Sequence, residues 1–278
     1  MKIETGTDDL LGRVDGHVAV LSFNRPERRN ALSSPMYEGF EQALPQIERD
    51  PEVRVLLVTG QGGAFCAGGD VKGMHENNTG GGTSGGATTP TSLEGSIGSL
   101  RSVQAQVSLA LRRLPMPVVA ALPGAAAGAG LSIALAADLR IAAERAVLVT
   151  AFANVGASGD FGTSWFLPRI VGEARAKELM FTSPRLTAAE AADLGIVNRV
   201  LPDDGFEDAA LAYCHDLANR APIALRYMKE NVNRALGSSL AEALDAEASA
   251  MVRTMGTADH REAAAAFVEK RPPEFSGR

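Results

Sequence analysis

The chain has 278 residues, of which 45% are hydrophobic and 22% are charged, and its formal net charge is −6. This length and composition predict a globular protein with one large domain, or a core with a helical appendage. The acidic balance argues against nucleic acid as the main partner. No apolar run is long enough to span a bilayer or to act as a signal peptide, so we expect a cytoplasmic location and no membrane partner.

The first 60 residues follow a strand–helix–strand pattern. Two alternating apolar segments around Asp15-Gly16 predict a β-hairpin. A serine pair followed by Pro35 predicts the start of a helix that ends near Arg49. The apolar, β-branched run 53–59 then predicts a buried strand. A strand, a helix and a strand in this order imply parallel pairing with a right-handed crossover.

Two stretches share one design, a buried strand that runs into a turn of small residues. After the strand at 53–59, five glycines lie between Gly60 and Gly69. A second strand at 117–122 leads through the turn 123–130 into a buried helix. Glycine allows the backbone to approach a ligand closely, and a helix start exposes unpaired N–H groups. Brought together, the two turns could aim two N–H donors at one negatively charged oxygen.

The first turn also allows simpler interpretations. Asp70 predicts the N-cap of a short helix over residues 71–74. The glycines could belong to an ordinary strand–turn–helix connection, in which they only make room. The turn lacks the Gly-Lys-Ser/Thr ending of a P-loop and the glycine spacing of a dinucleotide fingerprint, so neither phosphate-binding motif is expected.

The rest of the chain is expected to be mostly helical. Residues 77–99 are rich in Gly, Ser and Thr, which predicts either a mobile surface insertion or a lid or wall of a ligand pocket. A helix is expected over 100–114, and an aromatic-rich loop over 159–172. Short strands are expected at 138–142 and 146–150, and helices at 173–181, 187–194, 206–220, 223–236, 239–253 and 260–269.

Several motifs resemble those of the crotonase superfamily, the enoyl-CoA hydratase/isomerase family. Residues 64–70 (AFCAGGD) are similar to its first signature, and residues 123–138 to its second. The similarity extends to the segments FNRP (23–26), NAL (30–32), LGIVN with Val200 (194–200) and FVEKR (267–271). It implies an α/β crotonase (ClpP-like) fold of repeated ββα units over residues 1–200, with a C-terminal helical trimerisation part over 201–278. Homotrimers, often paired into hexamers, are implied as well.

The resemblance also implies an acyl-CoA substrate and no tightly bound cofactor. In the family, the thioester oxygen accepts hydrogen bonds from two backbone N–H groups, here those of Gly69 and Ala129. Enolate charge builds on that oxygen, and each preorganised donor is worth roughly 2.7–4 kcal/mol. The residues implied to contact the thioester's CoA part are Arg28, Ala31, Ala64, Ala67, Asp70, Gly128, Phe267 and Lys270. The last two would come from the C-terminal tail, either of the same chain or across a subunit interface.

Both glutamates that hydratases of the family use are absent. Ser132 occupies the first position and Phe152 the second. Hydration needs one group to activate water and another to manage the proton at the α-carbon, so ordinary hydratase activity is in doubt. Ser132 is expected either to bind substrate or a water, or to be satisfied within its own helix.

Asp160, within the segment GDFGTSW, is the candidate base. In several isomerase branches of the family, an acid at this loop position moves the proton. One carboxylate suffices for isomerisation, because it removes a proton beside the enolate system and returns it at another carbon. The aromatic rings of Phe152, Phe161, Trp165 and Phe166 could form an apolar wall for the substrate. Alternatively, Asp160 is a plain loop residue or an N-cap.

The leading hypothesis is therefore an enzyme that isomerises an unsaturated or ring-bearing acyl-CoA. A hydratase using other groups, a thioester hydrolase and an acyl-CoA-binding protein without turnover stay open. Cys66, beside the first turn, is expected to be a small buried residue rather than a nucleophile. The two cysteines suggest no disulfide framework, and the four histidines have no metal-binding spacing.

Overall fold

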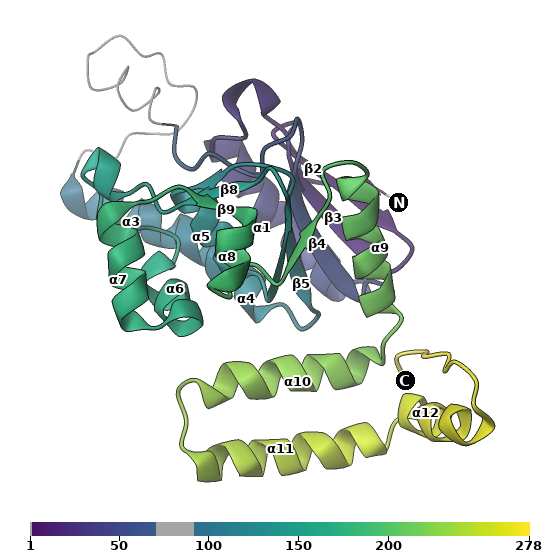
Figure 1. Ribbon diagram of the computed structural model, residues 1–278. Coiled ribbons are helices and arrows are strands. Elements are labelled where there is room, and N and C mark those ends of the chain that lie inside the picture. Colours follow the sequence, from purple (N-terminus) through teal and green to yellow (C-terminus); the bar gives the residue numbers. More distant parts are fainter. Residues whose placement is uncertain (1, 71–91) are drawn as a thin grey trace.

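The computed structural model describes residues 2–70 and 92–278, and within them a seven-stranded mixed sheet forms the centre (Figure 1). The expected α/β class is confirmed. In spatial order the strands are β1 (Lys2–Ile3), β2 (Leu10–Asp15), β3 (Val18–Phe23), β4 (Val55–Gly60), β5 (Val118–Leu122), β7 (Leu139–Ala143) and β10 (Arg199–Leu201). A small second sheet contains β6 (Ala126–Ala127), β8 (Val147–Val149) and β9 (Leu186–Thr187).

The pairing of the strands places the two glycine-containing turns at one edge of the sheet. Strands β2 and β3 form the expected antiparallel hairpin, with Asp15 opposite Val18. Strand β3 then pairs in parallel with β4, β4 with β5, and β5 with β7. Because the carboxyl ends of neighbouring parallel strands lie at the same edge, the chain leaves β4 and β5 side by side.

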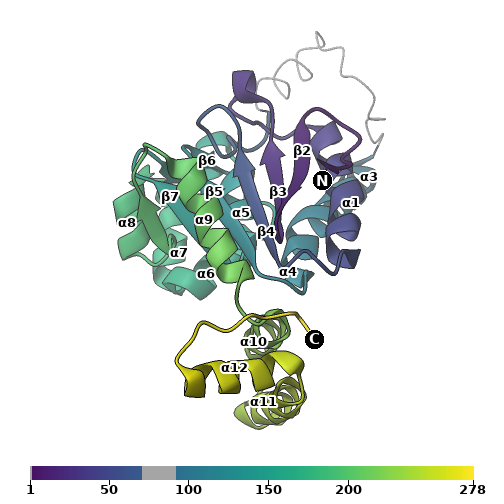
Figure 2. The same ribbon diagram turned by 90° about the vertical axis from the view of Figure 1, so that its right-hand side faces the viewer.

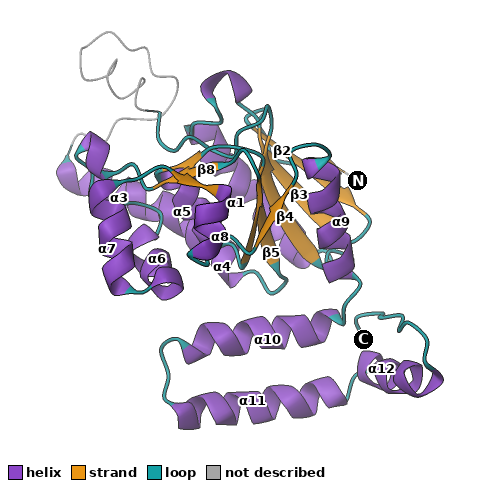
Figure 3. Ribbon diagram, viewed as in Figure 1, coloured by secondary structure: helices purple, strands orange, loops and turns teal. Residues whose placement is uncertain are grey.

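Helices cover both faces of this sheet (Figure 3). The helices of the described residues are η1 (Pro26–Arg28), α1 (Ser34–Arg49), α3 (Leu93–Gln104), the π-helical turn η2 (Ala105–Leu109), α4 (Ala110–Arg113), α5 (Ala129–Ala136), η3 (Ala153–Val155), α6 (Thr163–Val171), α7 (Glu173–Thr182), α8 (Ala188–Asp193), α9 (Phe206–Ala218), α10 (Pro222–Ala235), α11 (Leu240–Met255) and α12 (Ala258–Glu269). Helix α1 begins as expected, because the Ser33 hydroxyl accepts a hydrogen bond from the Met36 N–H.

Strand β4 is buried on both faces. Leu56 and Val58 belong to the larger hydrophobic cluster, which includes residues of α1 and α5. Val55 and Leu57 belong to a second cluster, to which α9 contributes Phe206. Figure 2 shows α9 lying across the strands on that face. Helix α9, which follows residue 200, therefore covers one face of the sheet. The expected division into residues 1–200 and 201–278 stays a prediction.

Helices α10, α11 and α12 lie apart from the sheet, with α10 nearest to it (Figures 1 and 2). A buried lysine on α10 ties them to the core. The Lys229 Nζ lies 2.6 Å from a carboxylate oxygen of Asp138 and donates to the Met116 carbonyl at 2.9 Å. Arg112 approaches the same carboxylate at 3.5 Å. Asp138, the acid that ends the second signature, thus links the sheet to the C-terminal helices. Across the described ranges, every helix is too short or too polar to cross a bilayer.

Two sequence-based expectations about local structure were wrong. Residues 163–171 form helix α6 rather than a loop, because burial of Phe166 and Leu167 stabilises a segment whose Pro168 and aromatic residues argue locally against a helix. Within the expected Gly/Ser/Thr-rich insertion at 77–99, residues from Leu93 onward are helical, since Ser92 caps them by accepting the Gly95 N–H. The expected helix over 71–74 and the rest of that insertion, up to residue 91, lie outside the described residues.

Candidate active site

The two turns after β4 and β5 are joined by backbone hydrogen bonds. The N–H groups of Phe65 and Cys66 donate to the Ala125 carbonyl at 3.0 and 3.1 Å. In return, the Ala127 N–H donates to the Cys66 carbonyl at 3.0 Å. The residues Cys66 and Ala126 form an isolated parallel bridge. The expectation that the turns come together is therefore met by direct pairing.

Glycines make this approach possible. Gly68 has a φ of +87°, and a Cβ there would lie 2.6 Å from the Ala127 carbonyl oxygen and 3.3 Å from the Ala129 nitrogen. A Cβ on Gly130 would lie 2.8 Å from both the carbonyl carbon and the Cβ of Cys66. Real Cβ atoms do not approach backbone this closely, so these positions need glycine for close contact and not merely for loop flexibility.

Both expected oxyanion donors lie at this junction. Ala129 is the first residue of α5, where N–H groups have no partner within the helix. Gly128 precedes it with a φ of 51° and is held by its own N–H, which donates to the Val149 carbonyl at 3.0 Å. Among the described residues, no acceptor takes the N–H of Gly69 or of Ala129. Both N–H groups are thus available to a ligand at this junction.

The N-terminal motif packs against the first turn. The Leu32 N–H donates to the Gly68 carbonyl at 2.8 Å, and the Ala67 N–H donates to the Arg29 carbonyl at 3.0 Å. The fully buried Asn30 donates its side-chain amide to the Ala64 carbonyl at 2.8 Å. These contacts place the N-terminal motif, which contains the expected CoA residues Arg28 and Ala31, against the first turn, which contains Ala64, Ala67 and Asp70.

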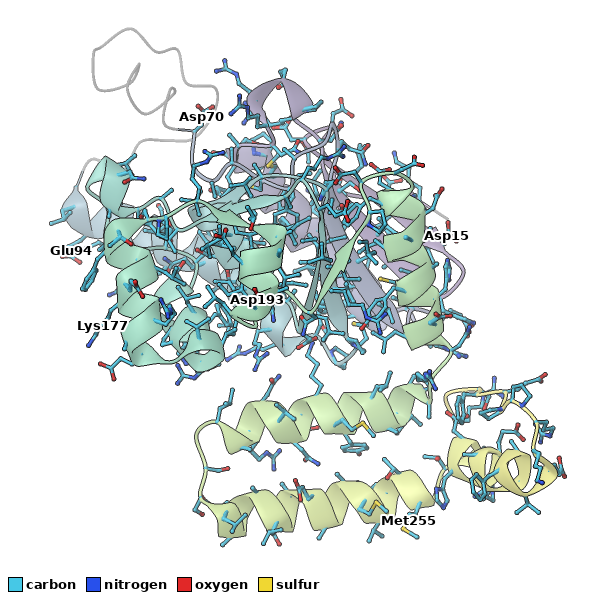
Figure 4. The ribbon with its side chains drawn as sticks, in the orientation of Figure 1. Asp15, Asp70, Glu94, Lys177, Asp193 and Met255 are labelled. Atoms are coloured by element: carbon cyan, nitrogen blue, oxygen red, sulfur yellow. The ribbon has the colours of Figure 1, made fainter. Side chains whose placement is uncertain are left out.

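Asp70 marks the rim of this region (Figure 4). Its carboxylate lies 3.8 Å from the Arg25 guanidinium, which also donates to the Ala31 carbonyl at 2.9 Å. The two C-terminal residues expected at the CoA moiety lie elsewhere. Phe267 and Lys270 are on and just after α12, and Figure 1 shows α12 beyond α10, away from the turns. The structure does not bring them to the site within one chain.

The carboxylate of Asp160 is held by two donors. Its Oδ1 accepts the Gln104 side-chain amide at 2.6 Å and the Phe161 N–H at 2.7 Å. Gly162, not Asp160, occupies the N-cap position of α6, so the N-cap alternative is wrong. Phe161 is a non-glycine residue with a φ of 49°, and its ring stacks on Tyr37 with centroids 5.9 Å apart.

Tyr37 connects Asp160 to the first turn. Burial raises the pKa of its phenol above the ordinary range, and at the high pH where the phenol would ionise, the nearby Cys66 thiolate and Asp160 carboxylate act in the same direction. Burial also raises the pKa of Cys66 to about 12, so its thiol stays protonated near neutral pH. A protonated, fully buried thiol is not a nucleophile, which agrees with the expectation for Cys66.

Ser132 and Phe152 are the two residues expected at the positions where hydratases carry glutamates. The buried Ser132 hydroxyl donates to the Gly128 carbonyl at 3.1 Å and shares a hydrogen bond with the Thr163 hydroxyl. The expectation that Ser132 is satisfied within its own helix is confirmed. The Phe152 ring lies 4.0 Å from where a Cβ of Gly128 would be, against the second turn. Neither side chain can exchange a proton as a carboxylate does.

A cavity of about 370 Å³ lies beside Asp160. Three of the four expected aromatic residues line it, namely Phe161, Trp165 and Phe166, while Phe152 does not. Arg169 stacks on Trp165, with its guanidinium carbon 4.0 Å from the ring centroid. The remaining lining residues are Arg101, Gln104, Ala105, Ser108, Leu109, Arg112 and Gly162. Asp160 does not itself line the cavity, and neither do Gly69 and Ala129. The two hydrogen-bond donors to Asp160, Gln104 and Phe161, do line it, so Asp160 lies behind this part of the wall.

The sequence did not reveal two residues around Asp160. Gln104 lies 56 positions from Asp160, and Tyr37, whose ring stacks on Phe161, is an ordinary member of an expected helix. No local spacing signals either contact. Thr163, whose hydroxyl donates to the Asp160 carbonyl, lies only three positions away. Tyr37 offered a weak signal, because it directly follows the apolar Met36 in the expected helix 34–49. In the structure Met36 is fully buried and Tyr37 is partly buried.

Comparison with known proteins gives the chain its family. The family model described as enoyl-CoA hydratase/isomerase matches residues 13–278. The chain is 35% identical over 270 residues to the 1,2-epoxyphenylacetyl-CoA isomerase of Escherichia coli, covering 97% of this chain and 98% of that protein. It is 34% identical over 262 residues to the short-chain-enoyl-CoA hydratase of Clostridium acetobutylicum, covering 94% of each. The crystal structure of an enoyl-CoA hydratase from Polaromonas superposes with a TM-score of 0.87 at 35% identity, covering 96% of this chain and 99% of that one. The chain therefore belongs to the enoyl-CoA hydratase/isomerase family and has its crotonase fold.

Proposed function

We propose that this protein isomerises an unsaturated or ring-bearing acyl-CoA thioester through an enolate. The backbone N–H groups of Gly69 and Ala129 hold the thioester oxygen, and Asp160 moves the proton. The observation that carries the proposal is the single carboxylate of Asp160, held beside an aromatic cavity while Ser132 and Phe152 replace the two hydratase glutamates. CoA enters as part of the substrate, and no tightly bound cofactor takes part.

The proposed reaction is a proton shuttle. The Asp160 carboxylate takes a proton from a carbon next to the unsaturated system, and the electron pair of that C–H bond moves into conjugation with the thioester. Negative charge collects on the thioester oxygen, where the two N–H donors stabilise it. The protonated Asp160 then delivers the same proton to another carbon, and the double bond reforms at its new position. The mass of the thioester does not change.

The cavity supports a bulky or ring-bearing acyl group. Phe161, Trp165 and Phe166 offer ring faces and edges at which another ring can pack at ordinary aromatic distances. The relative from Escherichia coli is named for an epoxide of phenylacetyl-CoA, which is a ring-bearing thioester. Other relatives are named hydratases, so an enoyl-CoA hydratase with different proton carriers is the second candidate. A thioester hydrolase and a non-catalytic acyl-CoA binder are further alternatives.

Paired assays with two substrates test the proposal. The protein is incubated with a 3-enoyl-CoA and, separately, with crotonyl-CoA, and products are followed by mass and by the absorbance of the conjugated thioester. We expect the 2-enoyl signal to rise at constant mass, with little addition of water to crotonyl-CoA. Efficient hydration would replace the isomerase by the hydratase candidate. Release of free CoA would indicate the hydrolase, and binding without any product would indicate the non-catalytic alternative.

We further propose that the protein assembles as a homotrimer or as a pair of trimers. Two observations support this: Phe267 and Lys270, which we expect at the CoA moiety, lie away from the turns of their own chain, and the C-terminal helices expose many apolar side chains. These are Met228, Val232, Leu236, Leu240, Leu244, Met251, Val252, Met255, Phe267 and Val268. Light scattering during size-exclusion chromatography should give the mass of three or six chains. A mass of one chain at micromolar concentration would contradict the proposed assembly.

A further inference from the structure

We infer that Gln104 is a positioning residue that fixes the Asp160 carboxylate by holding Oδ1, so that Oδ2 is the oxygen that exchanges the proton. This inference rests on the proposed function. The Gln104 amide donates to Oδ1 at 2.6 Å, and the Phe161 N–H donates to the same oxygen at 2.7 Å. Within residues 2–70 and 92–278, Oδ2 accepts no hydrogen bond. The two oxygens of one carboxylate are therefore unequal.

The two donors define the plane of the carboxylate. A hydrogen bond to an ionised oxygen is short and strong, and two of them on one atom oppose rotation about the Cβ–Cγ bond. Proton transfer requires the basic oxygen within hydrogen-bond reach of the reacting carbon, so a fixed direction contributes directly to the rate. Gln104 also lines the aromatic cavity, which places this restraint at the wall of the proposed acyl site.

The helix that carries Gln104 is interrupted at the next residue. The π-helical turn Ala105–Leu109 follows α3 directly and is continued by α4. Relative to a continuous α-helix, one inserted residue rotates α3 by about 100° about the helix axis. Val107 and Leu111 stay fully buried in the core while Gln104 faces Asp160. Single π-turns inside helices are common at functional sites, and this one has an evident consequence for the direction of Gln104.

The second donor is held by a strained residue. The φ of 49° at Phe161 is unfavourable for a bulky side chain, yet this backbone conformation accompanies the hydrogen bond from its N–H to the preceding Asp160 side chain. Burial of the Phe161 ring and its stacking on Tyr37 maintain the conformation. Strain of this kind persists where the surrounding structure enforces it, and it concentrates at functional sites. Both donors to Oδ1 thus lie at unusual backbone, since Gln104 directly precedes a π-turn and Phe161 has a positive φ.

Gln104→Met removes the donor and keeps the length of the side chain. We expect kcat to fall about tenfold to a hundredfold, the range for losing a hydrogen bond to a charged group, while KM stays close to that of the wild type. A donor to the ionised carboxylate favours that form, so its loss should move the acid limb of the kcat pH profile to higher pH. Gln104→Glu places a like charge beside Asp160 and should move that limb further in the same direction.

Gln106→Met is the matched control. Gln106 lies in the same π-turn, and its amide contacts only the Ser102 hydroxyl, at 3.4 Å, among the contacts of the described residues. We expect its kcat and pH profile to equal those of the wild type. Melting temperatures are measured for all variants. A variant that simply folds poorly has a lower amplitude at every pH, whereas loss of the hydrogen bond from Gln104 also displaces the acid limb.

The outcomes separate the inference from the proposed function. If Asp160→Asn is inactive but Gln104→Met and Gln104→Glu both retain the rate and the pH profile of the wild type, the positioning role of Gln104 is wrong and the proposed function stands. If Asp160→Asn retains the rate, the proposed function fails and the inference fails with it. Equal losses in Gln104→Met and Gln106→Met, without a displaced acid limb, would indicate that the π-turn is needed only for folding.

Discussion

Asp160→Asn is expected to lower the isomerisation rate by a factor of about 10²–10⁴, the usual contribution of a positioned acid or base. The amide cannot take a proton from carbon at neutral pH. Its oxygen can still accept the hydrogen bonds that Gln104 and Phe161 donate, so the local structure should be retained. Binding of the thioester should change little, because the oxyanion donors are backbone groups on two other segments.

The measurements are the initial rate with a 3-enoyl-CoA and the affinity for a CoA thioester by calorimetry. Asp193→Asn is the matched control, because it makes the same chemical change at an exposed residue of α8 (Figure 4). We expect this control to keep the rate of the wild type. An Asp160→Asn variant with an unchanged rate would remove Asp160 from the mechanism. A variant with both turnover and binding lost would mean that Asp160 is structural.

The parts of the site that sequence predicts are those carried by local pattern. A β-branched strand that ends in glycine can be identified without structure, and so the turns after β4 and β5 were placed correctly. Their pairing follows from parallel strand order, since neighbouring strands end at the same edge. Helix α1 was equally accessible, because Ser33 and Pro35 carry standard start signals.

The parts that sequence does not predict depend on contacts between distant segments. Gln104 is an unremarkable polar residue until tertiary packing places it against Asp160, 56 positions away. Helix α6 shows the same limit, because burial of its apolar face outweighs the local signal of Pro168. The π-turn that aims Gln104 also has no sequence signature of its own. Local propensity is a weak prior that tertiary contacts override.

Gly130→Ala should damage both the activity and the stability of the protein. The new Cβ would lie 2.8 Å from both the carbonyl carbon and the Cβ of Cys66. The carbonyl belongs to the backbone that pairs with Ala127, so it cannot rotate away. The start of α5 must therefore shift from the first turn and carry the Ala129 N–H with it. Loss of one oxyanion donor costs about 10²–10³ in kcat.

The free energy of unfolding should fall as well, because the cost of the close contact outweighs the gain in helix propensity. Alanine is favoured over glycine inside a helix by about 1 kcal/mol, whereas forcing an extra carbon into a packed contact costs about 1–3 kcal/mol and occasionally more. Gly98→Ala isolates the first effect, because Gly98 also lies in a helix and its Cβ would meet nothing within 4 Å. We expect Gly98→Ala to keep full activity and to melt at the same or a higher temperature, while Gly130→Ala loses both activity and stability.

The pair of variants tests whether the two turns act as one unit. If Gly130→Ala behaved like Gly98→Ala in melting temperature and in kcat, the turns would tolerate separation, and the two N–H groups would not form a preorganised site. If it lost stability but kept the rate per folded molecule, close packing of the turns would serve the fold alone. Loss of rate in a protein that is still folded is the result that the geometry predicts, because Ala129 and Gly69 can share one oxygen only while Gly130 lies against Cys66.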